Sequence, residues 1–293
     1  MYDDFLMTPA FDVLAPAEQR IPFVFNSPHS GSHYPDSFLE ASALDPLTIR
    51  SSEDCYVDEL YASAVLLGAP LLRARFPRAY LDVNREAYEL DQRMFFEAVP
   101  AYANTHSARV AGGLGTVPRN VGEGRLIYPG KIPLQSALDR IEKLYKPYHA
   151  QLRELLDKTR EKFGYAVLID CHSMPAGAEQ SGSRRADFII GDRFGRACHI
   201  GLAAATIDLL QNYGFEVAYN KPYAGGFITE HYGKPAENIH ALQLEMNRSL
   251  YMNEKTLEKL VSFDLLRRDL YSFLSDLTAL PDSVLGYSQL AAE

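Results

Sequence analysis

The sequence predicts an α/β fold in which a mainly parallel sheet is covered by helices on both faces. Short apolar runs alternate with longer helical patterns over much of the 293 residues, which is the order of elements in a doubly wound sheet. The apolar runs show little alternation with polar residues, as expected for strands buried on both faces. The composition, with 47% hydrophobic and 23% charged residues, is that of a globular protein with a sizeable core. We therefore expect residues 1–293 to form a single domain.

Six apolar runs are predicted to be strands, and four helical patterns lie between them. The strands are residues 21–26, 78–83, 165–170, 188–191, 215–219 and 240–246, with 70–74 as a further candidate. The helical patterns cover residues 54–67, 134–163, 193–213 and 255–277. Pro147 should kink or split the second pattern, and Gly164 stands where a helix C-cap is expected.

Two segments without a clear period are predicted to be long functional loops. Residues 95–133 and 177–185 are rich in Gly, Pro and Asn. In a doubly wound sheet, ligands gather at the carboxyl ends of the strands, so loops at that edge are favoured for binding and catalysis.

Charge and cysteine content exclude several classes of protein. The net charge of −9 and the lack of a Lys/Arg cluster argue against a nucleic-acid or anionic-membrane partner, so any anionic substrate must be met by locally placed arginines. Three cysteines without CxxC spacing indicate neither a disulfide framework nor a Cys-type zinc site.

The N-terminus lacks the pattern of a signal peptide, and no stretch approaches the length of a membrane span. We expect a soluble, cytoplasmic protein.

Two histidines directly follow predicted buried strands and are candidate metal ligands. His29 lies in Asn26-Ser-Pro-His29-Ser-Gly31 after the first strand, and His172 lies in Asp170-Cys-His172-Ser after the third. Neutral imidazole is a standard zinc ligand, and Asp170 could orient the His172 ring as a carboxylate partner. The alternative for each is an ordinary loop histidine. Because the same context occurs twice, we predict that both hold one catalytic metal ion.

The third ligand is left open among acidic residues at the start of the 54–67 pattern. A hydrolytic zinc site usually takes three protein ligands and keeps a fourth position for water. Glu53 and Asp54 lie at the helix start, and Asp58 and Glu59 lie one turn further in. Acids at this place also cap helices and offset the helix dipole, so the residues alone do not choose among them.

Arginines near another strand end are candidates for binding a substrate carboxylate. Arg85 follows the predicted strand 78–83 and can grip a carboxylate through two hydrogen bonds, with Asn84 as an additional donor. Arg119 and Arg125, in the long loop, could serve the same purpose. The alternative for each arginine is a surface ion pair.

Glu245 is the candidate general base. It lies near the end of the last predicted strand, where a carboxylate is costly unless it is paired or functional. The alternative is an ion pair with Arg248 or another cation. In the run Pro222–Gly233, Gly225 and Gly226 would let the backbone approach a ligand. GxGxxG, GxxxxGK[ST] and GxSxG motifs are absent from the sequence, so neither a nucleotide cofactor nor a serine nucleophile is expected.

Together these residues resemble the N-formylglutamate amidohydrolase family. The resemblance spans roughly residues 20–250. Its elements are Asn26-Ser-Pro-His29-Ser-Gly31, Asp54 with Val57-Asp58-Glu59-Leu60, Asp82-Val-Asn84-Arg85, Val117-Pro-Arg119, Asp170-Cys-His172-Ser-Met174, Tyr223-Ala-Gly-Gly226-Phe-Ile-Thr-Glu-His-Tyr-Gly233 and Gln243-Leu-Glu245-Met-Asn247.

The resemblance implies a fold similar to that of the zinc carboxypeptidases and aspartoacylase-type deacylases, a phosphorylase/hydrolase-like fold. It favours Asp54 over Glu53 as the third ligand beside His29 and His172, and one divalent metal ion, with Zn²⁺ expected, as cofactor. One departure is that the compact HxxE ligand spacing of the carboxypeptidases is absent, because Asp54 lies 25 residues after His29.

The resemblance also implies roles for the remaining candidates. Glu245 would be the general base, and Arg85 would be both catalytic and substrate-binding. Asn84, Arg119 and Gly226 would complete the substrate site. The expected reaction is the hydrolysis of N-formyl-L-glutamate, a small anionic N-acyl amino acid, to formate and L-glutamate in histidine degradation. The alternatives are a deacylase of another N-acyl amino acid or small peptide, and a non-catalytic binding protein of the same fold.

Overall fold

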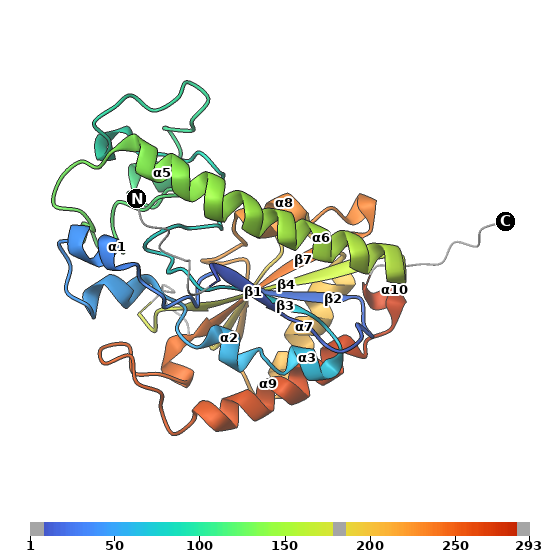
Figure 1. The fold of residues 1–293 in the computed structure, drawn as a ribbon. Coiled ribbons are helices and arrows are strands. Elements are labelled where there is room, and N and C mark those ends of the chain that lie inside the picture. Colours follow the sequence, from blue (N-terminus) through green and yellow to red (C-terminus); the bar gives the residue numbers. More distant parts are fainter. Residues whose placement is uncertain (1–8, 178–185, 286–293) are drawn as a thin grey trace. The chain divides into compact units, whose positions relative to one another are not determined.

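The computed structural model describes residues 9–177 and 186–285, and these form a mixed sheet with helices around it (Figure 1). The strand order is β1-β3-β2-β4-β7-β5-β6. The strands are β1 (Phe11–Leu14), β2 (Phe23–Ser27), β3 (Leu71–Ala74), β4 (Ala166–Met174), β5 (Phe188–Gly191), β6 (Val217–Tyr219) and β7 (Ile239–Asn247). β4 is parallel to β2 and β7, and β6 is parallel to β5, whereas β5 and β7 are antiparallel. The predicted α/β class with a mostly parallel sheet is confirmed.

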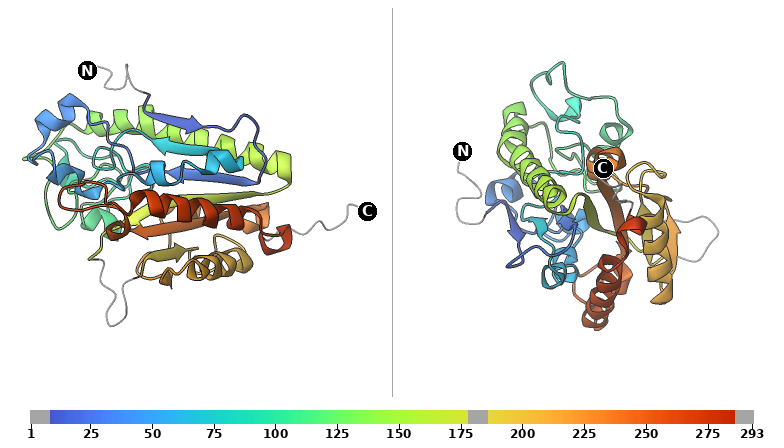
Figure 2. Two further views of the ribbon diagram at one scale, coloured as in Figure 1. Left: turned by 90° about the horizontal axis from the view of Figure 1, so that it is seen from below. Right: turned by 90° about the vertical axis from the view of Figure 1, so that its right-hand side faces the viewer.

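The central strands are buried along their whole length, and helices lie on both sides of them. Every residue of β2, β4 and β7 is buried. In Figures 1 and 2, α6 (Lys146–Phe163) lies on one side of β4 and β7, and α9 (Phe263–Thr278) lies on the other. The other helices are α1 (Asp36–Ala41), α2 (Val57–Leu60), α3 (Ala64–Leu67), α4 (Ala108–Ala111), α5 (Leu134–Arg140), α7 (Ile200–Asn212), α8 (Phe227–Tyr232) and α10 (Asp282–Leu285).

The chain divides into two compact units whose segments interleave along the sequence. One unit consists mainly of Pro28–Cys55 and Arg73–Leu152, and the other mainly of Val13–Ser27, Tyr56–Leu72 and the chain from Arg153 onward. The second unit contains the buried strands β2, β4 and β7 together with β5 and β6. A single domain over residues 1–293 stays a prediction.

The predicted strand at residues 78–83 is wrong. This segment is a turn followed by bends, in which the N–H groups of Tyr80 and Leu81 donate to the Pro77 carbonyl. Tyr80, Leu81 and Val83 are nevertheless buried, so a buried loop produced the same apolar run as a buried strand. The short strand β1 was not predicted, whereas the candidate at residues 70–74 is confirmed as β3.

The helical patterns are partly confirmed, with shorter helices than predicted. Residues 54–67 contain two short helices, α2 and α3, and the first begins only at Val57 because Tyr56 has a left-handed backbone (φ 65°). The pattern 193–213 becomes helical only at Ile200, and the pattern 255–277 only at Phe263. In the long central pattern, a π-helical turn at Ile141–Tyr145 separates α5 from α6 just before Pro147.

Gly164 ends α6 as predicted, with φ 85° and its N–H donating to the Arg160 carbonyl. Residues 95–133 are largely irregular, with α4 as the helical piece among them. The other predicted loop, apart from Gly177, lies outside the described residues. Within the described parts of the chain, no helix is long and apolar enough to span a membrane.

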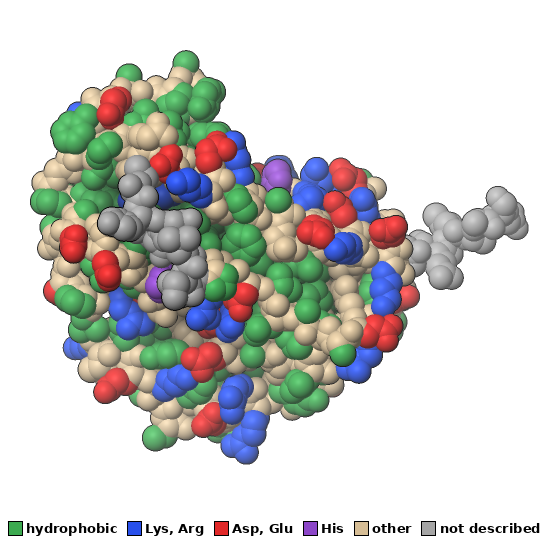
Figure 3. Space-filling model, viewed as in Figure 1, with side chains coloured by type: hydrophobic (Ala, Val, Ile, Leu, Met, Phe, Trp, Pro, Cys, Tyr) green, Lys and Arg blue, Asp and Glu red, His purple; other side chains and the backbone are tan. Residues whose placement is uncertain are grey.

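Charged side chains are interspersed on the face of the molecule that Figure 3 shows. Lys and Arg alternate there with Asp and Glu, without one continuous basic patch. This agrees with the excess of 38 acidic over 29 basic residues in the sequence. The absence of a nucleic-acid partner stays a prediction.

Candidate metal centre

The loop after β2 holds His29 and Asp54 next to each other. Gly31 approaches the chain at Phe76 so closely that a Cβ atom at Gly31 would lie 2.2 Å from the Phe76 carbonyl oxygen, so only glycine fits. The Asp54 N–H donates to the His29 carbonyl at 3.0 Å. The turn therefore fixes both candidate ligands through their backbone.

Asp82 orients the His29 ring. His29 Nε2 lies 2.8 Å from Asp82 Oδ1, and both side chains are buried. Burial alone would raise the pKa of Asp82, but Arg85, Arg78 and His29 hold it well below its usual range. With Nε2 donating to a carboxylate, Nδ1 is the ring nitrogen left with a lone pair for a ligand. The sequence reasoning missed this role of Asp82, although its place just before Asn84 and Arg85 drew attention to the segment.

Polar side chains lie in rows across β2, β4 and β7. Asn26 pairs in register with Asp170, Asp170 with Gln243, and His172 with Glu245, so these five side chains share one face of the sheet. Asn26 Nδ2 donates to Asp170 Oδ1 at 2.7 Å, and Asp170 Oδ2 lies 2.9 Å from His172 Nε2. The predicted contact between Asp170 and His172 is confirmed, and with Nε2 donating to this carboxylate the lone pair of the ring lies on Nδ1.

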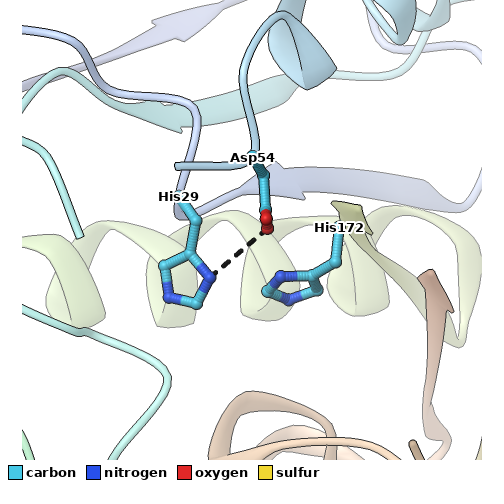
Figure 4. A group of neighbouring side chains, drawn as sticks. All are labelled: His29, Asp54 and His172. Atoms are coloured by element: carbon cyan, nitrogen blue, oxygen red, sulfur yellow. Dashed lines mark ion pairs between the residues drawn. The ribbon is translucent and has the colours of Figure 1, made fainter. Parts of the chain in front are cut away.

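His29, Asp54 and His172 form a buried group with the geometry of a metal site (Figure 4). One donor atom from each lies within 4.8 Å of those of the other two. His29 Nδ1 is 3.5 Å from Asp54 Oδ2, close to the roughly 3.4 Å between two donors bound tetrahedrally to zinc. Two imidazoles, each with a carboxylate on its second nitrogen, and one carboxylate are a donor set suited to Zn²⁺. The residues present therefore fit a divalent metal ion.

Glu53, the alternative acid, is occupied elsewhere. Its carboxylate accepts two hydrogen bonds from Arg50, at 2.9 and 3.0 Å, and one from the Tyr34 hydroxyl at 2.5 Å. Glu59 pairs with Lys259 at 2.5 Å. Among these acids, Asp54 is the one that lies with the two histidines.

Glu245 is held by its neighbour on the same strand. Gln243 Nε2 donates to Glu245 Oε1 at 2.8 Å, and Gln243 Oε1 accepts the Gly226 N–H at 2.7 Å. The Gly226 N–H is thus used within the chain. Arg248 donates to Ser173 Oγ through a 3.1 Å hydrogen bond and lies 4.0 Å from Glu254.

Arg85 is buried, with part of its hydrogen-bonding capacity used to fix it. Nε donates to the Leu114 carbonyl at 2.8 Å, Nη1 to the Asn84 carbonyl at 2.7 Å, and Nη2 faces Asp82 at 3.4 Å. These contacts engage each of the three guanidinium nitrogens once, whereas a guanidinium carries five N–H groups in all. Burial lowers the pKa of Arg85 to about 10, so the side chain stays charged at neutral pH.

The two loop arginines are engaged in ion pairs. Arg119 Nε lies 2.9 Å from Asp91, and Arg125 lies 3.4 Å from Glu123. These pairs leave the predicted role of Arg119 in substrate binding as a prediction.

Comparisons with known sequences give consistent similarities. The profile of the N-formylglutamate amidohydrolase family matches residues 21–252. A protein of Pseudomonas putida named N-formylglutamate deformylase is 31% identical over 246 residues, which cover 83% of this chain and 86% of the relative. A protein of the same name from Pseudomonas aeruginosa is 28% identical over 248 residues, which cover 83% of this chain and 87% of the relative.

The fold is similar to a solved structure as well. The crystal structure of N-formylglutamate amidohydrolase from Ralstonia eutropha matches with a TM-score of 0.86 and 34% sequence identity. The match covers 92% of this chain and 98% of that one. The residues that match the family profile, 21–252, include His29, Asp54 and His172 of the candidate metal site and also Glu245.

Proposed function

The chain belongs to the N-formylglutamate amidohydrolase family, and we propose from this that it hydrolyses N-formyl-L-glutamate to formate and L-glutamate. The observation that carries the proposal is the buried group of His29, Asp54 and His172, whose donor atoms lie close enough to share one ion. A divalent metal ion, with Zn²⁺ the first candidate, would supply Lewis acidity toward a carbonyl oxygen and toward water when bound there.

In the proposed reaction, Glu245 carries the proton between the two reactants. It takes a proton from the attacking water as the water oxygen forms a bond to the formyl carbon. The same carboxyl group then delivers that proton to the amide nitrogen as the C–N bond breaks. One water is consumed, its second proton ends on the amino group, and formate and glutamate with a protonated amino group are released. The position of Glu245 beside His172 in the β4–β7 register supports this role.

Binding of the substrate is assigned to cationic and amide groups. Arg85 and Asn84 would hold a carboxylate of the glutamate part, since the five N–H groups of a guanidinium exceed the three contacts that fix Arg85. Arg85 would also stabilise negative charge that develops on the carbonyl oxygen. Arg119 and the backbone at Gly226 would complete the site.

A substrate panel with and without chelator tests the proposal. N-formyl-, N-acetyl- and N-formimino-L-glutamate are compared for release of glutamate. We expect the formyl compound to be turned over at least tenfold faster than the other two, and chelator to abolish turnover. Preferred turnover of another acyl group would instead indicate the alternative deacylase, and no turnover of any compound by metal-loaded protein would indicate a binding protein.

The proposal extends to the setting of the reaction. Family membership supports a place as the last step of a histidine degradation route, in the cytoplasm, with residues 1–293 acting as one catalytic domain. Detection of L-histidine-dependent formate release in cells, lost when the gene is deleted, would test this setting.

A further inference from the structure

Gln243 connects the candidate base to a glycine-containing segment that packs on the same face of the sheet. On β7 it lies two residues before Glu245, so both side chains point to one face. Its amide is buried and bridges the Gly226 N–H, at 2.7 Å, and Glu245 Oε1, at 2.8 Å. The Thr229 hydroxyl adds a bond of 3.3 Å to Gln243 Oε1.

The bridge can form because of Gly191 on the neighbouring strand. Gly191 of β5 pairs in register with Gln243. A Cβ atom at Gly191 would lie 2.6 Å from the Gly225 nitrogen and 2.7 Å from the Ala224 carbonyl carbon. The missing side chain therefore lets the backbone of Ala224 and Gly225 pack on the sheet next to Gln243. The Arg193 N–H, donating to the Ala224 carbonyl at 2.7 Å, holds the segment there.

The chemistry of these partners allows only one orientation of the Gln243 amide. A backbone N–H can only donate, so the atom facing Gly226 must be the amide oxygen. The opposite end is then the NH₂ group, which also can only donate. Glu245 Oε1 therefore acts as an acceptor, and the Gln243 NH₂ group fixes how the Glu245 carboxylate is turned.

We propose that Gln243 is a positioning residue that holds the Glu245 carboxylate in one orientation for proton transfer and makes this orientation depend on the placement of residues 224–226. The inference rests on the proposed function for the role of Glu245, while the bridge itself rests only on the contacts above. Gln243 contacts Glu245, the Gly226 N–H and the Thr229 hydroxyl, so its proposed effect on the reaction passes through Glu245.

Two substitutions separate the ends of the bridge. Gln243→Glu keeps an acceptor for the Gly226 N–H but replaces the NH₂ donor by a carboxyl group that competes with Glu245 for a proton, so kcat should fall about 10- to 100-fold while KM stays within about threefold. Gln243→Met removes both bonds, so kcat should fall as much and KM should also rise. Gln19→Met is the matched control, because Gln19 likewise bridges the Ile21 and Phe23 carbonyls and the Thr159 hydroxyl, and it should leave kcat unchanged.

Amide hydrogen exchange of residues 223–229 gives a second readout that does not need turnover. Exchange should be faster in Gln243→Met than in the wild type and unchanged in Gln243→Glu. If the wild type hydrolyses none of the tested amides, the proposed function fails, and exchange alone then decides whether the bridge exists. The inference is overturned if folded Gln243→Glu, with a wild-type melting temperature, keeps kcat within twofold, or if exchange in Gln243→Met equals that of the wild type.

Discussion

Asp82 lies 2.8 Å from Nε2 of His29, although 53 residues separate the two in the sequence. The contact fixes the ring so that Nδ1 faces Asp54 at 3.5 Å. Asp82 is in turn surrounded by Arg78, at 3.0 Å, and Arg85, at 3.4 Å. One buried carboxylate thus links the metal centre to the arginine proposed to hold the substrate.

Replacing Asp82 by Asn should weaken both metal binding and folding. The amide keeps an oxygen near His29 but leaves Arg78 and Arg85 without their shared counter-charge. We expect metal affinity to fall about 10- to 100-fold and the free energy of unfolding at pH 7 to fall by about 3–5 kcal/mol. Competitive metal titration and urea denaturation measure the two effects. Asp264→Asn, which removes a solvent-exposed pair with Arg267, is the control and should change neither.

Substitution of Asp54 should lower the metal content of the protein, whereas substitution of Glu53 should lower its stability. Asp54→Asn removes a proposed ligand, so bound metal measured by mass spectrometry should fall below about a tenth of the wild-type amount at the same free metal concentration. Glu53→Gln breaks the contacts with Arg50 and Tyr34, so it should lower stability by about 1–3 kcal/mol while the metal content stays at one ion per chain. The reverse pattern would assign the ligand to Glu53.

Removing the metal should lower both activity and stability. An ion bound only by the folded state stabilises it by about 4 kcal/mol when its concentration is a thousand times the dissociation constant. Dialysis against chelator should therefore abolish turnover and lower the melting temperature, and added Zn²⁺ should restore both. Full activity in protein shown by elemental analysis to be free of metal would contradict the proposed site.

The central strands and the residues at their ends could be predicted because both carry local signals. Strands buried on both faces appear as continuous apolar runs, so β2, β4 and β7 were recognised to within a few residues. His172 and Glu245 interrupt such runs at the same edge of the sheet, which identified them as candidates. Residues 78–83 show the limit of this signal, because an apolar run records burial and does not record whether the backbone pairs with a strand.

Partners distant in sequence could not be predicted in this way. The contact between His29 and Asp82 depends on how a buried loop returns to the site, and no sequence spacing encodes this contact.

The choice between Glu53 and Asp54 as metal ligand depends on the direction in which each side chain leaves the backbone. Here a local signal did exist, because Arg50 lies three residues before Glu53 and pairs with it.

Arg85→Lys should weaken the binding of anionic substrate and product. Lysine keeps the charge but lacks the planar pair of donors that matches a carboxylate. A lost charge-assisted hydrogen bond of about 1.5–3 kcal/mol corresponds to an affinity for L-glutamate that is weaker by about 10- to 150-fold, as measured by calorimetry. Arg73→Lys, at a pair with Asp12 outside the site, is the control. Unchanged glutamate affinity in Arg85→Lys would remove Arg85 from the substrate site.

His240 should make the folded state sensitive to acid independently of the metal centre. It lies at the start of β7, where its Nδ1 accepts the His199 N–H at 3.1 Å, and it is buried. Burial, with a smaller effect of His199, lowers its pKa to about 4 from the usual 6.5. Between these two values the unfolded chain binds a proton that the folded chain does not, so stability is complete above pH 6.5 and is lost as the pH falls toward 4.

The full loss from His240 is on the order of 3 kcal/mol. His240→Gln supplies an uncharged acceptor for the His199 N–H, so the variant should lose less stability than the wild type between pH 7 and pH 4.5, by about 2–3 kcal/mol. Urea denaturation at both pH values measures this difference. His106→Gln, at an exposed position, should follow the wild type. If wild type and His240→Gln lose the same stability, His240 is already able to bind a proton in the folded state, and the acid sensitivity has its origin in the carboxylates.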